Sequence, residues 1–197
     1  MSSSETERRF VDIMSEWLVS LPHDLKILYE AASDENLERA HRELAVGAII
    51  STISPNEHAR GDRYDFLSYC DDCILLRLAL RRIAGANDED AEVFRGRFSD
   101  FFAPLDDELA VCERVMGDLF KWLDSRVEEL RKLEYKGKTI VAYLDDDEAA
   151  ELLYEEGLGF ATEYPVDEET IGDRLKKAST ILEVLERRKR EFDRKTA

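Results

Sequence analysis

The chain has 197 residues, 45 of them acidic and 28 basic, which gives a formal charge of −17 at pH 7. So negative a chain is a poor general nucleic-acid binder, because such binding needs a positive surface that releases counterions. Its longest uninterrupted apolar run, Leu44 to Ile50, is far shorter than the roughly 20 residues of a transmembrane helix. Its three cysteines do not make a disulfide framework. The composition therefore favours a cytoplasmic protein.

The N-terminal third of the chain has the periodicity of amphipathic helices. Apolar residues from Phe10 to Leu21 recur at three- and four-residue intervals and mark one face of a helix. Pro22 is expected to end this helix and to open a second, short one, because its missing N–H costs nothing in a first helical turn. Ser33 and Asp34 then supply the cap of a third helix, which becomes apolar on nearly all sides.

A polar loop over residues 54–64 precedes the most apolar segment of the chain, residues 65–84. Apolar side chains cover most of the circumference of this segment, which predicts a helix buried between others. Gly85 to Asp88 are expected to end that helix and to cap the next. The next helix carries a stripe of phenylalanines at positions 94, 98, 101 and 102.

Two further segments have the seven-residue repeat of helices that pack lengthwise. Pro104 is expected to open a long helix over residues 104–135, and a second long helix is predicted over 167–194. The apolar seam of the second helix consists of Ile171, Leu175, Leu182 and Leu185. Because the two seams have the same period, the helices are predicted to pair with each other or to meet copies of themselves in a dimer.

Between these two helices the pattern is ambiguous. Residues 139–144 fit either a short strand or the beginning of a helix, and both remain open. A helix is predicted for residues 145–156, because its acidic start suits the positive end of the helix dipole. Gly157 and Gly159 are expected to end it.

The sequence Cys70-Asp71-Asp72-Cys73 has the CxxC spacing of redox and zinc sites. A redox pair needs a stabilised thiolate, and the intervening aspartates disfavour one. A zinc site needs two more ligands, and the sequence holds no second CxxC and no HxxxH pair. Two buried cysteines on a central helix are therefore the expected state.

Asp71 and Asp72 are unusual because they open so apolar a segment and have no basic residue four positions later. The preceding loop offers three basic candidates for pairing, namely His58, Arg60 and Arg63. Such a pairing pins the loop to the helix. The alternative is a divalent-cation site in which Glu57 or Asp62 joins the two aspartates. No other cofactor is expected.

One basic cluster stands near the C-terminus of this acidic chain. It consists of Arg187, Arg188, Lys189, Arg190, Arg194 and Lys195. Cations at the end of a helix are stabilised by the negative end of its dipole, which accounts for the cluster without a partner. The alternative is a contact with anionic lipid or with nucleic acid.

Part of the chain resembles a known family. Ile53-Ser54-Pro55, then Tyr69 to Asp72, then the run from Leu75 to Leu80 resemble the YkvA-like bacterial domain of unknown function. The likeness covers about residues 37–84; the loop prolines and apolar loop residues of the family are replaced here by polar residues. The resemblance implies an all-α core and carries over no activity.

Together these patterns predict an all-α bundle of about seven helices, with 104–135 and 167–194 as a long helix pair. A helical core is expected over residues 5–135, and an appendage that packs on it over 136–197. The function that we expect is that of a non-enzymatic interaction or regulatory module with a protein partner or a second copy of itself. The alternatives are a divalent-cation protein or metal-dependent enzyme, and a peripheral membrane protein.

Overall fold

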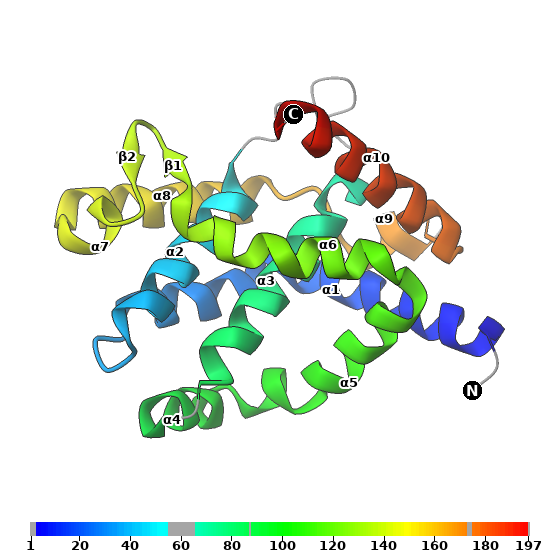
Figure 1. Ribbon diagram of the computed structural model, residues 1–197, viewed down its shortest axis with the longest axis horizontal. Helices are drawn as coiled ribbons and strands as arrows, with labels where there is room; N and C mark the ends of the chain where they lie inside the picture. The colour runs from blue at the N-terminus through cyan, green and yellow to red at the C-terminus, as the bar shows by residue number, and fades with distance from the viewer. Residues whose placement is uncertain (1–2, 55–65, 87, 173–174, 197) are drawn as a thin grey trace.

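The computed structural model describes residues 3–54, 66–86, 88–172 and 175–196 (Figure 1). Within these ranges the chain is all-α, as predicted, with ten α-helices and one two-stranded hairpin. In chain order the elements are α1 (Ser3–Ser33), α2 (Arg39–Ile53), the 3-10 helix η2 (Phe66–Tyr69), α3 (Cys70–Ala84), α4 (Glu89–Arg97), α5 (Ser99–Met116), α6 (Asp118–Arg126), the 3-10 helix η3 (Val127–Lys132), β1 (Glu134–Tyr135), β2 (Lys138–Thr139), α7 (Ala142–Asp145), α8 (Asp147–Glu163), α9 (Glu168–Gly172) and α10 (Ala178–Thr196). There are more helices than the predicted seven because both predicted long helices are divided.

The helix α1 is continuous, and the predicted break at Pro22 is wrong. Leu18, Leu21, Leu25 and Leu28 carry one apolar face through the proline without a change of phase, and all four are buried. A proline inside a helix costs about 3 kcal/mol, whereas each buried leucine side chain contributes roughly 1.5–3 kcal/mol. The burial of this face therefore outweighs the lost backbone hydrogen bond.

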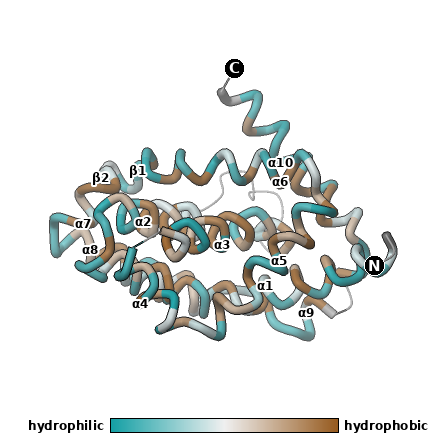
Figure 2. The backbone as a smooth tube through the Cα atoms, turned by 60° about the horizontal axis from the view of Figure 1, so that its bottom comes forward, coloured by the Kyte–Doolittle hydropathy of each residue, from teal (hydrophilic) through white to brown (hydrophobic). Residues whose placement is uncertain are grey.

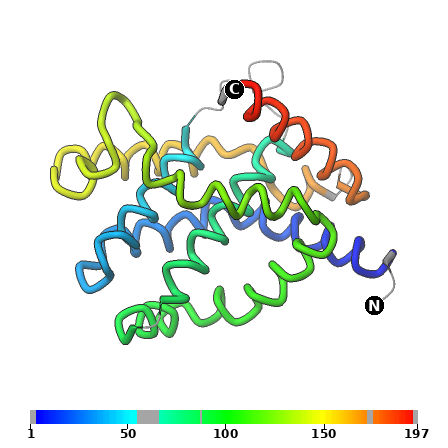
Figure 3. Tube along the Cα trace, viewed as in Figure 1, coloured from blue at the N-terminus to red at the C-terminus, as the bar shows by residue number. Residues whose placement is uncertain are grey.

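The predicted helix 104–135 is divided into α5, α6 and η3, and α5 begins before Pro104, at Ser99. The division between α5 and α6 falls at Gly117, whose backbone has a φ of +54°. Glycine adopts such a φ at little cost, and a residue there cannot continue a right-handed helix. The chain turns sharply at this point, as the green segment of Figure 3 shows.

The predicted helix 167–194 is likewise divided, into α9 and α10. The ring of Phe192 on α10 lies 6.1 Å from that of Trp122 on α6 and 4.4 Å from the Arg126 guanidinium. The two long segments thus meet where α6 contacts α10. The helix α10 also contacts α1, α3 and η2, and its C-terminal end projects from the rest of the molecule (Figure 2).

The four seam residues of 167–194 lie against the protein itself. Ile171, Leu175 and Leu185 are buried, and Leu182 is half-buried. They belong to the same hydrophobic cluster as the buried residues of 5–135, so the predicted core and appendage share apolar contacts. Self-association through this seam therefore requires α9 and α10 to leave these contacts. None of the helices formed by the described residues has both the length and the apolar composition needed to cross a membrane.

The ambiguous residues 139–144 contain the end of a strand and most of a short helix. The strand β2 ends at Thr139, and α7 begins at Ala142. Lys136 and Gly137 form the turn between β1 and β2, with φ values of 47° and 76°, as two-residue hairpins of type I′ require. The predicted helix after residue 145 is α8, and its cap is the side chain of Asp146.

The helix α8 runs through Gly157 and Gly159 to Glu163, so the predicted stop at these glycines is wrong. A Cβ atom at Gly157 would lie 2.1 Å from the Tyr29 hydroxyl oxygen. The same hydroxyl donates a hydrogen bond of 2.7 Å to the carbonyl of Leu153. Gly157 therefore allows α8 to approach α1 closely.

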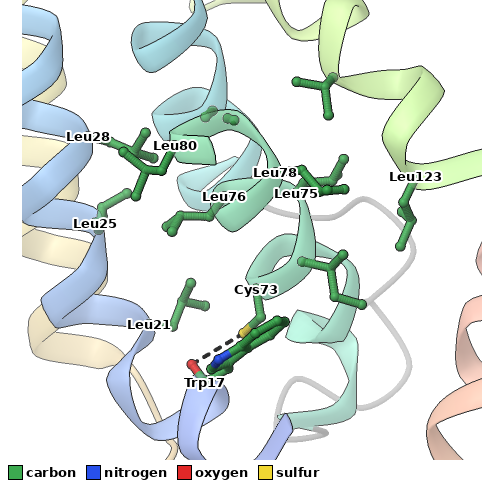
Figure 4. Packing of buried hydrophobic residues seen from close by; sticks show 14 of the residues in the cluster. Trp17, Leu21, Leu25, Leu28, Cys73, Leu75, Leu76, Leu78, Leu80 and Leu123 are labelled. Carbon is green, nitrogen blue, oxygen red and sulfur yellow. Dashed lines mark hydrogen bonds between the residues drawn. The ribbon is translucent and has the colours of Figure 1, made fainter. Parts of the chain in front are cut away.

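The helix α3 lies at the centre of the fold, in contact with α1, α2 and α6. Figure 4 shows its leucines beside those of α1. Thirteen of its fifteen residues are buried, as its sequence predicts. Because the helix is so nearly enclosed, its charged residues Asp71, Asp72 and Arg77 are enclosed with it.

Candidate functional site

Burying a charge is costly unless the charge is paired. The three buried charges of α3 therefore indicate where polar sites lie in the otherwise apolar core. Two clusters form around them. We call Asp71 and Asp72 the carboxylate pair. We call the hollow above Arg77 the acidic cleft; it lies between α1, α3 and α5 and has a volume of about 240 Å³.

The carboxylate pair receives its cation from the C-terminal helix. The Nε atom of Arg188 on α10 lies 3.9 Å from Oδ1 of Asp71, and both side chains are about nine-tenths buried. Arg188 also donates a hydrogen bond of 3.0 Å to the carbonyl of Ser68. The partner described for Asp71 is therefore a member of the C-terminal basic cluster. The predicted partners His58, Arg60 and Arg63 lie outside the described residues.

The carboxylate pair is compensated in charge but poorly hydrogen-bonded. Among the described residues, Oδ1 of Asp71 and Oδ2 of Asp72 are buried without a hydrogen-bond donor. Burial raises the pKa of both carboxyl groups, and the charge of Asp71 raises the pKa of Asp72 further. The positive charges of Arg188 and Arg126 act in the opposite direction. In this environment the neutral acid is favoured more than it is in water.

The divalent-cation hypothesis remains a prediction at this site. Its loop members, Glu57 and Asp62, lie outside the described residues. Within the described ranges, no group of three or more histidine, cysteine, aspartate and glutamate side chains is arranged to hold a metal ion. The carboxylate pair faces Arg188 instead.

The cysteines of the CxxC sequence are buried free thiols, as is Cys112. Burial raises the pKa of the Cys73 thiol, and it raises that of Cys112 to about 12. A thiolate is the nucleophilic form of cysteine, so neither group is activated. The Cys73 thiol donates to the carbonyl of Trp17, at 3.4 Å.

The floor of the acidic cleft is the Arg77 guanidinium, whose side chain is 4% exposed. It donates hydrogen bonds to the carboxylate of Asp24, to the Ser20 hydroxyl (3.0 Å) and to the Cys73 carbonyl (3.2 Å). The Ser20 hydroxyl donates in turn to Asp24. This ion pair is thus embedded in a hydrogen-bonded network, the condition under which a buried pair is tolerated.

Two aromatic rings stand beside the floor. The Arg77 guanidinium lies 4.3 Å from the centre of the Trp17 ring and 5.6 Å from that of Phe101. The indole N–H of Trp17 donates a hydrogen bond of 3.0 Å to Oε2 of Glu108 on α5. Glu108 is therefore held in a fixed orientation, with its side chain 13% exposed.

The lining of the cleft is strongly acidic. It consists of Glu16, Trp17, Ser20, Asp24, Arg77, Asp100, Phe101, Pro104, Leu105 and Glu108. These residues include four carboxylates and one guanidinium, a net charge of −3. Glu16 and Asp100 are exposed, so the lining presents negative charge to solvent beside the partly exposed ring of Phe101, whereas Trp17 is buried. That combination suits a cation with apolar surface, such as a basic side chain.

This cleft was not predicted from the sequence, although α1 contains a signal for it. Trp17, Ser20 and Asp24 are spaced by three and four residues and therefore share one helical face. The predicted break at Pro22 separated Asp24 from the other two. Arg77 stands out as a charge in an apolar segment, but its contact with Asp24 and the contribution of Glu108 depend on tertiary packing and have no local signal.

Comparison with protein-family models, with curated proteins and with solved structures found no match to this chain. The resemblance of residues 37–84 to the YkvA-like domain therefore stays a prediction, and the site has to be interpreted from its own geometry.

Proposed function

We propose that the protein is a non-enzymatic interaction module that recognises a positively charged segment of a protein partner at the acidic cleft. The observation that supports this proposal is the lining of the cleft, where four carboxylates and two aromatic rings surround a single guanidinium. The chain as a whole carries a charge of −17. A field of that sign increases the rate at which basic partners are encountered.

Two carboxylates of the cleft are held in fixed orientations by hydrogen bonds within the protein. Asp24 is held by Arg77 and Ser20, and Glu108 is held by Trp17. Fixed acceptors need little reordering when a ligand binds, which reduces the entropic cost of association. The partly exposed ring of Phe101 adds aromatic surface, and aromatic residues dominate the energetics of many protein interfaces.

Fluorescence anisotropy with a labelled peptide of alternating arginine and glycine tests the proposal. We expect the double variant Glu16→Gln/Asp100→Asn to bind this peptide about two- to thirtyfold more weakly than the wild type, since each exposed charge pair contributes roughly 0.2–1 kcal/mol. The matched control is Asp106→Asn/Asp107→Asn, which removes two exposed charges from α5 outside the cleft. Equal losses in the two double variants, or no binding to the wild type, would contradict the proposal.

A divalent-cation protein is the second candidate, favoured by the buried carboxylate oxygens of Asp71 and Asp72 that lack hydrogen-bond donors among the described residues. Calcium or magnesium that binds the folded state there raises the melting temperature. We expect the substitution Asp72→Asn to abolish such a rise. A rise that survives this substitution places the cation elsewhere.

A further inference from the structure

Two of the carboxylates that line the acidic cleft, those of Glu16 and Glu108, are already paired with a guanidinium of the protein itself; we call these two residues the mouth of the cleft. Arg9 on α1 places Nη1 3.8 Å from Oε1 of Glu16 and Nη2 3.4 Å from Oε1 of Glu108. Its two terminal nitrogens thus reach two different carboxylates of the cleft. The spacing of Glu16 and Glu108 therefore fits one planar, two-pronged cation.

The two guanidiniums of this region differ in how firmly they are held. Arg77 is 4% exposed, and its hydrogen-bond acceptors lie on α1 and α3. Arg9 is 42% exposed and faces Glu16, which is 63% exposed. Exposed ion pairs contribute little to stability because water and salt screen them. Arg77 is consequently a fixed part of the floor, whereas another cation can replace Arg9 beside its carboxylates.

Glu108 gives the mouth its selectivity. One of its oxygens accepts the indole N–H of Trp17, and the other accepts from Arg9. Because Trp17 orients the carboxylate, the second oxygen faces any cation that enters the mouth. A guanidinium spans two carboxylates with separate N–H groups and stacks flat on aromatic rings, whereas a lysine ammonium is a compact point charge.

We infer that the acidic cleft binds an arginine side chain of the partner, and that Arg9 is an internal competitor which this arginine displaces. The inference rests on the proposed function and adds two things to it, the chemical class of the bound side chain and a residue that weakens binding. Glu16 and Glu108 then exchange one guanidinium for another, with no change of net charge in the mouth.

The test uses blocked pentapeptides with one central residue, either arginine, lysine or citrulline, flanked by glycine and serine. Binding is followed by ¹⁵N NMR through the indole N–H of Trp17, which the variant Trp122→Phe distinguishes from the other tryptophan signal. Three proteins are compared: the wild type, Arg9→Ala and Arg8→Ala. Arg8 is the exposed neighbour of Arg9, so its removal changes the net charge equally and leaves the mouth occupied.

We expect Arg9→Ala to bind the arginine peptide roughly two- to fivefold more tightly than Arg8→Ala does. The lysine peptide should bind more weakly than the arginine peptide, and the citrulline peptide should not bind. Equal affinities of Arg9→Ala and Arg8→Ala would overturn the competition by Arg9, and equal affinities for arginine and lysine would overturn the preference for a guanidinium. Neither outcome contradicts the proposed function. That function is overturned if the peptide of alternating arginine and glycine binds none of the three proteins.

Discussion

Two clusters of buried charge stand five residues apart on α3, and they are stabilised in different ways. At Arg77 a single cation has three hydrogen-bond acceptors and an aromatic neighbour. At the carboxylate pair two anions face Arg188, at 3.9 Å from Asp71, and two of their oxygens lack a donor among the described residues. The first cluster is satisfied by directional bonds and the second mainly by opposite charge.

Because of this difference, we expect the Arg77 cluster to be rigid and the carboxylate pair to be sensitive to pH. A hydrogen-bonded buried ion pair resists change, because removal of either partner leaves an unpaired charge in the core. A cluster stabilised mainly by opposite charge responds to protonation, because burial disfavours the charged form of its carboxyl groups. The acidic cleft is built on the first kind of cluster, which suits a preorganised binding surface.

The largest expected effect in this comparison is that of Arg77→Met, which leaves Asp24 buried without its cation. We expect the free energy of unfolding to fall by about 3–5 kcal/mol, as measured by urea denaturation. The control is Arg81→Met, because Arg81 is partly exposed and its contact with Asp124 is 3.5 Å long. Its loss should be below about 1 kcal/mol. Similar losses in the two variants would show that the Arg77 network stabilises the protein no more than a partly exposed ion pair does.

A smaller loss is expected for Arg188→Met. This substitution removes the ion pair with Asp71 and the hydrogen bond to Ser68, but Arg126 still opposes the negative charge of the carboxylate pair. We expect a loss of about 1–3 kcal/mol in the free energy of unfolding. Arg187→Met, at an exposed position of the same helix, should change little. A loss larger than that of Arg77→Met would reverse the comparison.

The smallest expected effect has the opposite sign. The pKa of Asp72 is raised in the folded protein by burial and by Asp71, so its stabilising contribution is complete below its unfolded pKa and is lost as the pH rises through the folded pKa. The substitution Asp72→Asn removes the ionisable group, so the variant does not lose this stability as the pH rises. We therefore expect the variant to melt at a higher temperature than the wild type at pH 7, and the difference to shrink toward about pH 4. A difference that does not depend on pH would contradict a raised pKa.

The fold class and the buried helix could be predicted because they depend on local patterns. Within residues 65–84, the apolar residues of the α3 part, Cys70–Ala84, cover all sides of the helix and are buried as expected, whereas residues 66–69 form the 3-10 helix η2. Asp88 caps α4 through the backbone N–H of Ala91. The division at Gly117 could not be predicted from the seven-residue repeat, because the repeat continues on both sides of it. Only the backbone conformation of Gly117 shows that the helix ends there.

The candidate sites were predictable only where a residue conflicts with its surroundings. Asp71 and Asp72 stand out in the sequence because carboxylates are rarely placed in so apolar a segment. Arg188, the cation that pairs with Asp71, lies more than a hundred residues further along the chain. It belongs to the C-terminal basic cluster, which the helix dipole accounted for without any partner. The acidic cleft gave a weaker signal: Arg77 is a charge in the same apolar segment, but nothing in the sequence indicates its partner Asp24 or its nearness to Glu108.

The cleft also has a consequence for how the protein folds. The bond between Trp17 and Glu108 joins residues 91 positions apart, and that between Arg77 and Asp24 joins residues 53 apart. Contacts so distant in sequence require large loops to close and generally form late. An intermediate in which α1 and α2 have docked but α5 has not would contain Trp17 without Glu108. In such an intermediate the acidic cleft would be incomplete until α5 docks.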